Sequence, residues 1–465
     1  MSDENRDLIV LGSGPGGYTA AIRAAQLGRK VTIVERESLG GVCLNWGCIP
    51  TKALLTSASL LQQIKHSSQL GFSIESLRVD FPKIVERSRA VAERLSAGVK
   101  YLMKKNQIEV VWGRGKLMGG RRLVVADAEG YSRTFSYSDL IIAVGASPRL
   151  LPGVKPDGEV IHTSRTILEF KRLPQKMLII GAGAIGVEFA YFFHCLGTKI
   201  TLVEMLDRVL PLEDRELSGE LEKIFRKQGM LIMTGTQVEN LRQTGKVVSA
   251  TLKSNNSEEK WSGDCCLVAI GVTPNTAEIG LEKEGIRIEK RFIATGNDMA
   301  CNIPHHFAIG DAAGPPLLAH KASHEGVLAA EAACRLTPHA LCRDNIPSCT
   351  YCRPQVASVG MTEEAVKQAG LKYRTGKIPF SAIGKALAAG EAEGFIKVIV
   401  SEDTGEILGT HIIHPEAVEL ISAATLIRSH EGIAQSVLDT IFPHPTLSEG
   451  LFEAVALAQG RPLNF

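Results

Sequence analysis

The chain of 465 residues is 45% hydrophobic and 22% charged, and its formal net charge is +2. This composition is typical of a globular protein of roughly three domains, and the near-neutral charge excludes an electrostatic case for binding nucleic acid or an anionic membrane surface. The apolar runs are shorter than a membrane span, and the acidic N-terminus shows no signal region or Arg-rich transit segment. We therefore expect a soluble, cytoplasmic protein.

An apolar strand near the N-terminus runs into a glycine-rich turn and then into a helical pattern. The glycines are Gly12, Gly14 and Gly17, and the next predicted strand ends in Glu35. In such a turn the first glycine permits the tight bend, the second lets a pyrophosphate approach the backbone, and the third lets the helix pack on the strand. The acid accepts hydrogen bonds from a ribose. The layout predicts a dinucleotide-binding βαβ unit; a glycine-rich turn without a ligand is the alternative.

Two cysteines, Cys43 and Cys48, follow the predicted ribose acid at a spacing of five residues. In an ideal helix their Cα atoms would lie roughly 8.6 Å apart, whereas a disulfide needs less than about 7 Å. A bridge would therefore need a bent segment, which Gly47 and Pro50 could supply. A strained, accessible bridge would suit redox catalysis, and two independent thiols are the alternative.

Two long helices are predicted next, over residues 52–70 and 81–105, followed by short strands that end at Gly145. A turn-rich crossover at residues 146–153 then leads out of this first nucleotide-binding sheet.

A second glycine-rich turn repeats the spacing of the first. Its glycines are Gly181, Gly183 and Gly186, and its second strand ends in Glu204. A single pattern of this kind is weak evidence, whereas a duplicated pattern with the same flanking strands and acids is strong. We therefore predict a second dinucleotide-binding unit, whose sheet the chain leaves at Gly271.

The fold class predicted from this order is α/β, with two Rossmann-like nucleotide-binding domains and an α+β C-terminal domain. The predicted domain boundaries are 1–150 for the first part of the first nucleotide-binding domain, 151–271 for the second, 272–345 for the second part of the first, and 346–465 for the C-terminal domain.

The remaining cysteines are expected to be reduced and buried, as small hydrophobic residues. These are Cys195, Cys265, Cys266, Cys301, Cys334 and Cys342. Cys349 and Cys352 form a CxxC pair, but no second ligand pair or helix start accompanies them, which favours a structural role over a metal or redox role.

The segment Gly40–Leu55, which contains Cys43 and Cys48, closely resembles the redox-disulfide motif of the pyridine nucleotide–disulfide oxidoreductases, and among them that of the dihydrolipoamide dehydrogenases. The resemblance covers essentially the whole chain and includes four further motifs: Phe307–Asp311, Leu318–Ser323, Pro379–Leu387 and Phe442–Glu449. It implies an FAD-binding first domain, an NAD-binding second domain and a C-terminal dimerisation domain.

The resemblance also implies which residues contact each cofactor. For FAD they are Gly12, Gly14, Gly17, Glu35, Lys52, Gly115, Asp311 and Ala319. For NAD they are Gly181, Ala182, Gly183, Ala184, Ile185, Gly186, Glu204, Val238 and Gly271. No metal site is expected.

Catalytic roles follow from the same resemblance. Cys48 matches the thiol next to the flavin, and Cys43 matches the thiol that exchanges with the substrate. Lys52 and Glu188 match an ion pair beside the reacting flavin edge, where a fixed cation favours reduced, anionic flavin.

His444 matches the family's base, and Glu449 matches the carboxylate that orients it. From the residues alone, Thr446–Glu449 before an apolar helix is typical of a capping box, so Glu449 also has a structural interpretation. The two roles are compatible if Glu449 serves mainly the imidazole. A carboxylate that fixes one tautomer helps His444 to accept a thiol proton near neutral pH.

The implied activity is that of a dihydrolipoamide dehydrogenase, which oxidises protein-bound dihydrolipoyl groups through the disulfide and FAD and reduces NAD to NADH. The implied partners are a lipoylated acyltransferase or carrier protein of a 2-oxoacid dehydrogenase or glycine cleavage complex, and a second copy of the chain whose disulfide His444 serves. The alternative is another FAD-dependent disulfide reductase. Glu204 without an adjacent basic cluster and a C-terminus without cysteines disfavour its glutathione and mercuric types.

Four residues depart from the family's common pattern: Phe442, Trp46, Val272 and His414. None of them removes a catalytic group. The sequence leaves their effect on substrate affinity and redox potential open. The retained cysteines, lysine, histidine and glutamate also disfavour a non-catalytic structural subunit.

Overall fold

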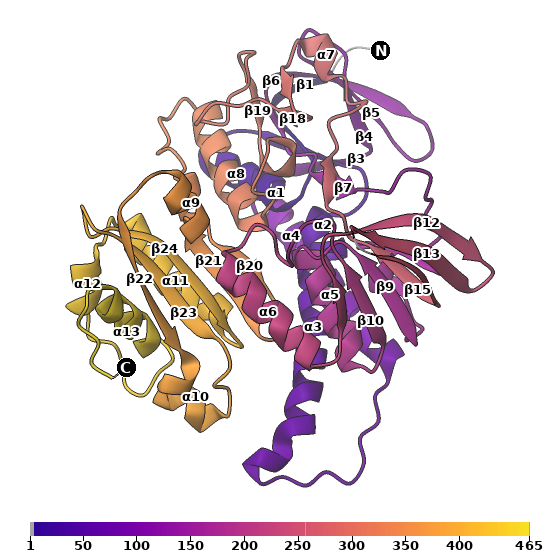
Figure 1. Cartoon of the computed structure of the whole chain (residues 1–465). Coiled ribbons are helices and arrows are strands. Elements are labelled where there is room, and N and C mark those ends of the chain that lie inside the picture. Colours follow the sequence, from indigo (N-terminus) through magenta and orange to yellow (C-terminus); the bar gives the residue numbers. More distant parts are fainter. Residues whose placement is uncertain (1–3, 256, 465) are drawn as a thin grey trace. The chain divides into compact units, whose positions relative to one another are not determined.

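The computed structural model describes residues 4–255 and 257–464, and the chain divides into two compact units (Figure 1). The first unit comprises Met1–Ala53, Lys83–Arg149 and Val272–Leu341. The second comprises Leu54–Pro82, Leu150–Gly271 and Cys342–Phe465. Each unit is therefore assembled from three separate stretches of the chain.

The first unit is centred on a sheet with the strand order β3-β2-β1-β6-β5-β4, in which β19 also pairs with β6. The pairs β1–β2, β1–β6, β2–β3 and β6–β19 are parallel, whereas β4, β5 and β6 form an antiparallel meander. Parallel pairs need long crossover connections, which α1 and the following segments provide. The strands are β1 (Glu4–Leu11), β2 (Val31–Glu35), β3 (Glu109–Trp112), β4 (Arg114–Leu117), β5 (Arg122–Ala126), β6 (Ser132–Ile142) and β19 (His306–Ala308).

Helices α1 (Pro15–Gln26) and α8 (Ala319–Ala333) pack closely against each other in this unit. Glycine allows the approach, because a Cβ on Gly326 would collide with the carbonyl oxygen of Gly16. Leu8 and Ile33 from the sheet are fully buried beneath them. The smaller elements of the unit are α2 (Gly41–Trp46), β7 (Ala146–Pro148), β16 (Val272–Pro274), α7 (Leu281–Glu284), β17 (Ile288–Glu289), β18 (Phe292–Ile293) and η3 (Gly310–Ala312).

The second unit contains a parallel sheet with the order β11-β10-β9-β15-β8 and a separate antiparallel sheet β12-β13-β14. Helix α5 packs on β10 and β9 and carries buried aromatic side chains. The elements are β8 (Ile161–Thr163), β9 (Lys176–Ile180), α5 (Ala184–Cys195), β10 (Lys199–Val203), α6 (Arg215–Lys227), β11 (Leu231–Met233), β12 (Thr236–Thr244), β13 (Val247–Ser254), β14 (Glu258–Gly263) and β15 (Cys265–Val268).

A five-stranded antiparallel sheet, β20-β21-β24-β23-β22, forms the C-terminal part of the second unit. Helix α11 packs on β21 and β24, and α13 packs on β22 and β23. The elements are β20 (Ser348–Thr350), β21 (Gln355–Gly360), α9 (Glu363–Gln368), β22 (Tyr373–Pro379), α10 (Gly384–Ala389), β23 (Phe395–Ser401), β24 (Ile407–His414), α11 (Ala417–Ser429), α12 (Ala434–Leu438) and α13 (Glu449–Ala458).

A buried ammonium group joins α6 to this C-terminal sheet. Lys397 in β23 is 1% exposed, and its Nζ lies 3.1 Å from Asp214, 2.9 Å from Glu216 and 2.7 Å from Glu363. Asp214 also caps α6 by accepting the backbone N–H of Glu216 at 3.0 Å. The nucleotide-binding part and the C-terminal sheet of the second unit are thus held by a charged cluster as well as by apolar packing.

The predicted fold class is confirmed, and α4 (Phe81–Lys105) has the predicted ends. Helix α3 (Cys48–His66) begins earlier than predicted, because Gly47 ends α2 and Pro50 then falls in the first turn of a new helix, where its missing N–H has no intrahelical acceptor. Within the described ranges, no helix combines the length and the hydrophobicity that crossing a membrane requires.

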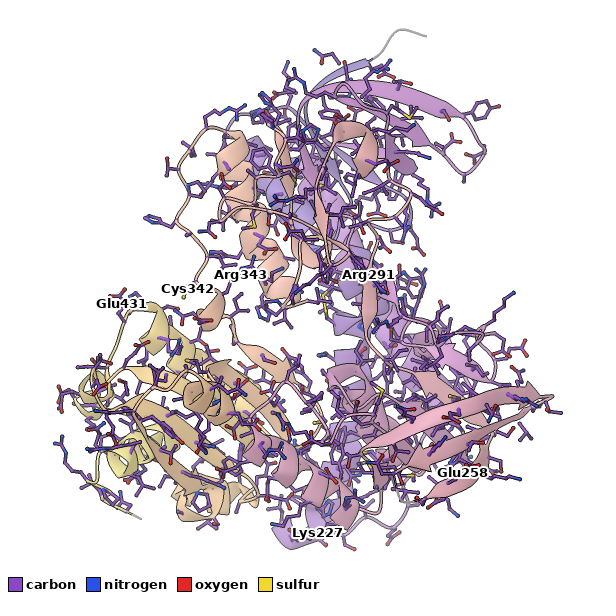
Figure 2. The ribbon with its side chains drawn as sticks, turned by 45° about the horizontal axis from the view of Figure 1, so that its top comes forward. Lys227, Glu258, Arg291, Cys342, Arg343 and Glu431 are labelled. Atoms are coloured by element: carbon purple, nitrogen blue, oxygen red, sulfur yellow. A yellow bond between two sulfur atoms is a disulfide. The ribbon has the colours of Figure 1, made fainter. Side chains whose placement is uncertain are left out.

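The expectation that the remaining cysteines are buried is wrong for Cys342, which is exposed on the segment before β20, next to Arg343 (Figure 2). The expectation holds for Cys195, Cys265 and Cys266, whereas Cys301 and Cys334 are only partly buried. Burial raises the pKa of the Cys265 thiol to about 12, which makes it unreactive at neutral pH.

Candidate functional site

The first glycine-rich turn, between β1 and α1, has the geometry that a dinucleotide requires. Gly12 has a φ of +103°, and a Cβ on Gly17 would collide with the carbonyl oxygen of Gly12, so both positions require glycine. Gly14, at the start of α1, instead faces open space, because a Cβ there would meet no atom within 4 Å. A pyrophosphate could therefore approach the backbone at Gly14 and the N-terminus of α1.

Glu35 lies beside this turn at the end of β2. Its Oε2 accepts hydrogen bonds from the backbone N–H of Ser13 at 3.0 Å and from the Ser13 hydroxyl at 2.6 Å, and its Oε1 accepts from the N–H of Glu37 at 2.9 Å. The carboxylate is thus fixed next to the turn, and carboxylate oxygens have further lone pairs that can accept ribose hydroxyls. The residues present fit the adenosine end of a dinucleotide.

The second turn, between β9 and α5, repeats this geometry in the other unit. A Cβ on Gly186 would collide with the carbonyl oxygen of Gly181, while Gly183 faces open space. Glu204 accepts the backbone N–H of Ala182 at 2.7 Å and that of Leu206 at 2.9 Å. The duplication predicted from the sequence is therefore also a duplication of the hydrogen-bond pattern around the acid.

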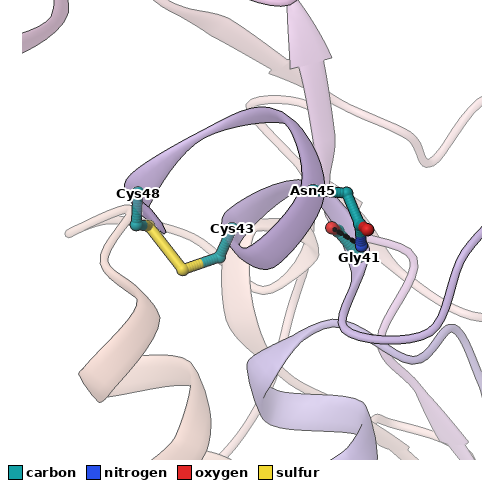
Figure 3. Close-up of a disulfide and its surroundings, with 4 residues drawn as sticks. All are labelled: Gly41, Cys43, Asn45 and Cys48. Carbon is teal, nitrogen blue, oxygen red and sulfur yellow. Dashed lines mark hydrogen bonds between the residues drawn. A yellow bond between two sulfur atoms is a disulfide. The ribbon is translucent and has the colours of Figure 1, made fainter. Parts of the chain in front are cut away.

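Cys43 and Cys48 form a disulfide at the junction of α2 and α3 (Figure 3). Their Cα atoms are 4.7 Å apart, because Gly47, with φ −152° and ψ −109°, interrupts the helix between them. The bent segment predicted for a bridge is therefore present. Asn45 stabilises the bend by donating its side-chain amide to the carbonyl oxygens of Leu39 and Gly41, each at 2.9 Å.

The disulfide-bearing helix packs directly on the first dinucleotide turn. A Cβ on Gly41, whose φ is +57°, would lie 2.7 Å from the Cα of Gly14. The first unit thus places an accessible redox pair next to a dinucleotide-binding turn, which is the arrangement needed to move electrons between a disulfide and a bound flavin.

A histidine–carboxylate pair lies at the start of α13 in the second unit. The Nδ1 of His444 is 2.8 Å from Oε1 of Glu449, while Oε2 of Glu449 accepts the backbone N–H of Thr446 at 2.8 Å. These two contacts hold the pKa of Glu449 below its usual 4.5. The imidazole itself is 80% exposed, so its Nε2 can reach a substrate proton.

Two family models match the chain. The model of the pyridine nucleotide-disulphide oxidoreductases matches residues 6–326, and the model of their dimerisation domain matches residues 346–455. The chain belongs to the pyridine nucleotide-disulphide oxidoreductase family. It is therefore an FAD-dependent oxidoreductase that uses a pyridine nucleotide, as the resemblance of its motifs implied.

Relatives and solved structures agree with this membership. The chain is 46% identical over 463 residues to a dihydrolipoyl dehydrogenase of Zymomonas mobilis, and 42% identical over 481 residues to one of Rhizobium etli, with 99% of each chain covered in both cases. The crystal structure of LpdA from Mycobacterium tuberculosis matches with a TM-score of 0.91 at 27% identity, covering 97% of this chain and 99% of that one. The flavoprotein disulfide reductase RclA from Escherichia coli matches with a TM-score of 0.85 at 25% identity, covering 97% and 99%.

The roles that the family resemblance implies for Lys52, Glu188 and Gly115 stay predictions, and the structure shows the surroundings of each residue. Lys52 lies one helical turn after Cys48 and on the same face of α3. Glu188 is buried in α5, where it accepts the backbone N–H of Tyr351 at 2.9 Å. Gly115 packs between Leu11 and Leu123 in the core of the first unit.

A buried ion pair that the sequence analysis missed holds the motif Phe307–Asp311, whose Asp311 is predicted to contact FAD. Lys321 and Glu325 in α8 are both fully buried, with Nζ 3.1 Å from Oε1, and Glu325 also accepts the N–H of Gly310 at 2.8 Å. The pair fixes the loop that carries Asp311 to α8, whose N-terminus at Ala319 has no side-chain cap among the described residues. Burial raises the pKa of Asp311. The sequence signal for this ion pair is its spacing of four residues, which places the side chains of Lys321 and Glu325 next to each other on one face of a helix.

The departures from the family pattern have structural explanations at three of the four positions. Arg89 lies 4.3 Å from the centre of the Trp46 ring, and the ring of Phe442 lies 6.4 Å from that of Phe452. His414 accepts the backbone N–H of Glu416 on Nδ1 and therefore donates from Nε2 to the carbonyl oxygen of Glu391, at 2.9 Å. Burial lowers the pKa of His414 to about 4, so this imidazole is neutral and structural. The structure offers no explanation for the valine at position 272.

The other residues singled out from the sequence have structural surroundings. Val238 packs at the edge of the apolar cluster of the second nucleotide-binding sheet. Cys352 is buried and donates to the carbonyl oxygen of Pro354 at 3.1 Å, while Cys349 packs on the C-terminal core. The described ranges contain no cluster of side chains suited to a metal ion.

Proposed function

We propose that this chain is a dihydrolipoyl dehydrogenase, which transfers electrons from protein-bound dihydrolipoyl groups to NAD. The observation that carries the proposal is the Cys43–Cys48 disulfide packed on the first dinucleotide turn. Full-length identity to proteins named dihydrolipoyl dehydrogenase supports the choice of substrate. FAD would be held by the turn at Gly12–Gly17 and Glu35, and NAD by the turn at Gly181–Gly186 and Glu204.

The chemistry begins with a proton transfer and two thiol–disulfide exchanges. His444 Nε2 accepts the proton of one dihydrolipoyl thiol, and the resulting thiolate attacks Sγ of Cys43, which breaks the Cys43–Cys48 bond and releases the Cys48 thiolate. The second dihydrolipoyl thiol then attacks the substrate sulfur bound to Cys43. This closes the lipoyl disulfide and leaves Cys43 reduced. Cys43 and Cys48 give up the electron pair and two protons when their disulfide reforms; FAD, when bound, would supply the acceptor for that pair, and NAD would supply the final hydride acceptor.

Glu449 would assist by holding one tautomer of His444 and by stabilising the imidazolium. Lys52 would provide positive charge near the reduced cofactor, and Glu188 is the carboxylate that the family resemblance implies as its counter-charge. We propose that the enzyme is a homodimer in which His444 of one subunit serves the disulfide of the other; the match to the dimerisation-domain model supports a dimer.

The proposed partner is a lipoylated acyltransferase or carrier protein of a 2-oxoacid dehydrogenase or glycine cleavage complex, and the proposed location is the cytoplasm. The similarity to RclA favours one second candidate, a flavoprotein disulfide reductase with another substrate. A substrate panel with purified protein separates the two. We expect NADH formation from dihydrolipoamide and NAD, with little oxidation of NADPH by glutathione disulfide. A preference for NADPH and a disulfide other than lipoamide would favour the second candidate.

A further inference from the structure

The break between α2 and α3 at Gly47 is what brings Cys43 and Cys48 together. With the disulfide formed, their Cα atoms lie 4.7 Å apart. If α2 and α3 joined into one continuous helix, the same atoms would lie roughly 8.6 Å apart, beyond the limit of about 7 Å for a disulfide. The proposed function opens this disulfide in every turnover. The break must therefore persist when the covalent bond does not enforce it.

Two carbonyl oxygens at the C-terminal end of α2 bear on whether the helix can continue. In a continuous helix the oxygen of Trp46 would accept an N–H from residue 50, but that residue is a proline and has none. The oxygen of Asn45 would accept the N–H of Ile49. In the structure it accepts a hydrogen bond from Nη1 of Arg89 in α4, at 2.5 Å. This contact satisfies the terminal carbonyl without a further helical turn, so it stabilises the break.

The indole of Trp46 holds the guanidinium at this oxygen. Cζ of Arg89 lies 4.3 Å from the centre of the Trp46 ring, which is a cation–π contact. Both side chains are partly buried. Because Trp46 lies between Asn45 and Gly47, the segment that bends supplies both the hydrogen-bond acceptor and the ring. We call this contact of Arg89 with Asn45 and Trp46 the arginine clamp.

Helix α4 also holds the N-terminal end of α2. The hydroxyl of Ser96 donates to the carbonyl oxygen of Leu39 at 2.9 Å, and the side-chain amide of Asn45 donates to the same oxygen at 2.9 Å. The same amide reaches the oxygen of Gly41 (Figure 3). Arg89 and Ser96 are seven residues apart, which is about two turns of helix and places them on one face of α4. Helix α4 therefore contacts both ends of α2.

We propose that Arg89 and Trp46 are positioning residues that keep the thiols of Cys43 and Cys48 side by side in the reduced enzyme, an inference that rests on the proposed redox role of the disulfide. The bond enforces the break in the oxidised enzyme, so there the segment cannot relax if the clamp is lost. The reduced segment can relax, because its sulfurs are free to separate. Loss of the clamp therefore shifts the equilibrium toward the reduced form and makes the disulfide easier to reduce.

The charge of Arg89 predicts the opposite shift if it acts on the sulfurs directly. A nearby cation stabilises a thiolate, which exists only in the reduced enzyme. Removal of the charge would then make the disulfide harder to reduce. The direction of the shift therefore separates a positioning role from an electrostatic one.

The test is the equilibrium between disulfide and dithiol in the FAD-loaded enzyme, measured in anaerobic buffers of reduced and oxidised dithiothreitol. Reduction moves two electrons and two protons from dithiothreitol to Cys43 and Cys48, and alkylation followed by mass spectrometry counts the free thiols. For Arg89→Met we expect the equilibrium constant for reduction to rise by about tenfold or more, the scale of a hydrogen bond from a charged group, which is about 30 mV. An unchanged or a lower constant would overturn the proposal.

Trp46→Leu should shift the constant in the same direction by about two- to fivefold, the scale of a cation–π contact. The double variant with Arg89→Met should shift it no further than Arg89→Met alone, because the indole acts through the guanidinium. Additive shifts would contradict the arginine clamp.

Arg87→Met is the matched control from the same helix. Arg87 donates to the carbonyl oxygen of Ala53 at 3.0 Å, but this oxygen lies inside α3, where the helix already supplies a donor. Its loss should change the constant by less than about twofold, and a shift equal to that of Arg89→Met would contradict the proposal. Bound FAD and NADH-to-dye electron transfer report that each variant is folded. A wild-type enzyme that does not oxidise dihydrolipoamide would contradict the proposed function, whereas the dithiothreitol equilibrium still tests the clamp.

Discussion

Glu449 divides its two carboxylate oxygens between an imidazole and a backbone amide: Oε1 lies 2.8 Å from Nδ1 of His444, and Oε2 accepts the N–H of Thr446 at 2.8 Å. The second contact is the half of a capping box in which the carboxylate reaches back to the backbone. Helix α13, however, begins at Glu449 with Ser448 as its N-cap, and the Thr446 hydroxyl donates to Pro443 instead. The capping box predicted at Thr446 is therefore wrong, and Glu449 combines an orienting contact with a local backbone contact.

Replacing His444 with glutamine should lower lipoamide turnover by roughly two to four orders of magnitude, the usual scale for loss of general acid–base catalysis. Glu449→Gln should cost less, because it removes orientation and not the base itself. Electron transfer from NADH to a dye should be unaffected in both variants, since it needs no proton from the dithiol. Equal losses in the two assays would contradict the assignment of His444 as the base.

The pH dependence of this pair has a defined sign. The pKa of Glu449 is held below 4.5 by the Thr446 N–H and by His444. A depressed carboxyl pKa gives a contribution that is complete above the unfolded value and lost as the pH falls through the folded value. The orienting contact should therefore be fully present at neutral pH and fail only below pH 4.5. A titration of the Glu449 carboxyl by NMR would check this, and a midpoint above 4.5 would contradict it.

Mixing two damaged subunits tests the proposed sharing of sites. A heterodimer of a Cys43→Ser subunit and a His444→Gln subunit should keep about half of wild-type activity, because both lesions fall in one site and the other site stays intact. Sites built within a single chain would each be damaged, and the heterodimer would be nearly inactive. Tagged subunits allow the heterodimer to be isolated from both homodimers.

NAD should be preferred over NADP by about 10- to 150-fold in kcat/KM, since a 2′-phosphate would displace a hydrogen bond to the charged Glu204, worth about 1.5–3 kcal/mol. Arg208, the nearest following arginine, is already paired with Glu364 at 2.8 Å and is not free to hold a phosphate. Glu204→Gln keeps the size of the side chain but removes the negative charge that would repel a 2′-phosphate. The preference for NAD over NADP should therefore become smaller. Comparable wild-type values for the two cofactors would reopen the glutathione-reductase type.

Lys397→Met should lower the free energy of unfolding by about 3–5 kcal/mol, because it leaves the buried carboxylate of Asp214 without its cation. Lys377→Met is the matched control: Lys377 also contacts Glu216 but is 45% exposed, so its loss should cost under about 1 kcal/mol.

Burial opposes ionisation of Glu363, yet hydrogen bonds from Lys367 and Lys397 hold its pKa at about 2. Its contribution to stability should therefore be complete above pH 4.5 and lost as the pH falls toward 2. Urea unfolding at several pH values measures both effects.

The features predicted from the sequence are those with local signals. Glu35 and Glu204 were found because turn, helix, strand and acid follow in a fixed order, and the bend between Cys43 and Cys48 followed from helix geometry and Gly47. The Lys397 cluster could not be found in this way, because Asp214 lies 183 residues from Lys397 and only the folded chain brings them together. The same holds for Trp46, whose contact with Arg89 depends on the packing of α4 on α2.

The most direct test of the account is NADH formation from dihydrolipoamide and NAD by the purified enzyme and by its Cys43→Ser variant, with FAD content measured in both. We predict rapid NADH formation by the wild type and its loss in the variant, with FAD retained, because the substrate dithiol must exchange with the Cys43–Cys48 disulfide. Dihydrolipoamide oxidation that persists without Cys43, or that is absent from the FAD-loaded wild type, would contradict the account.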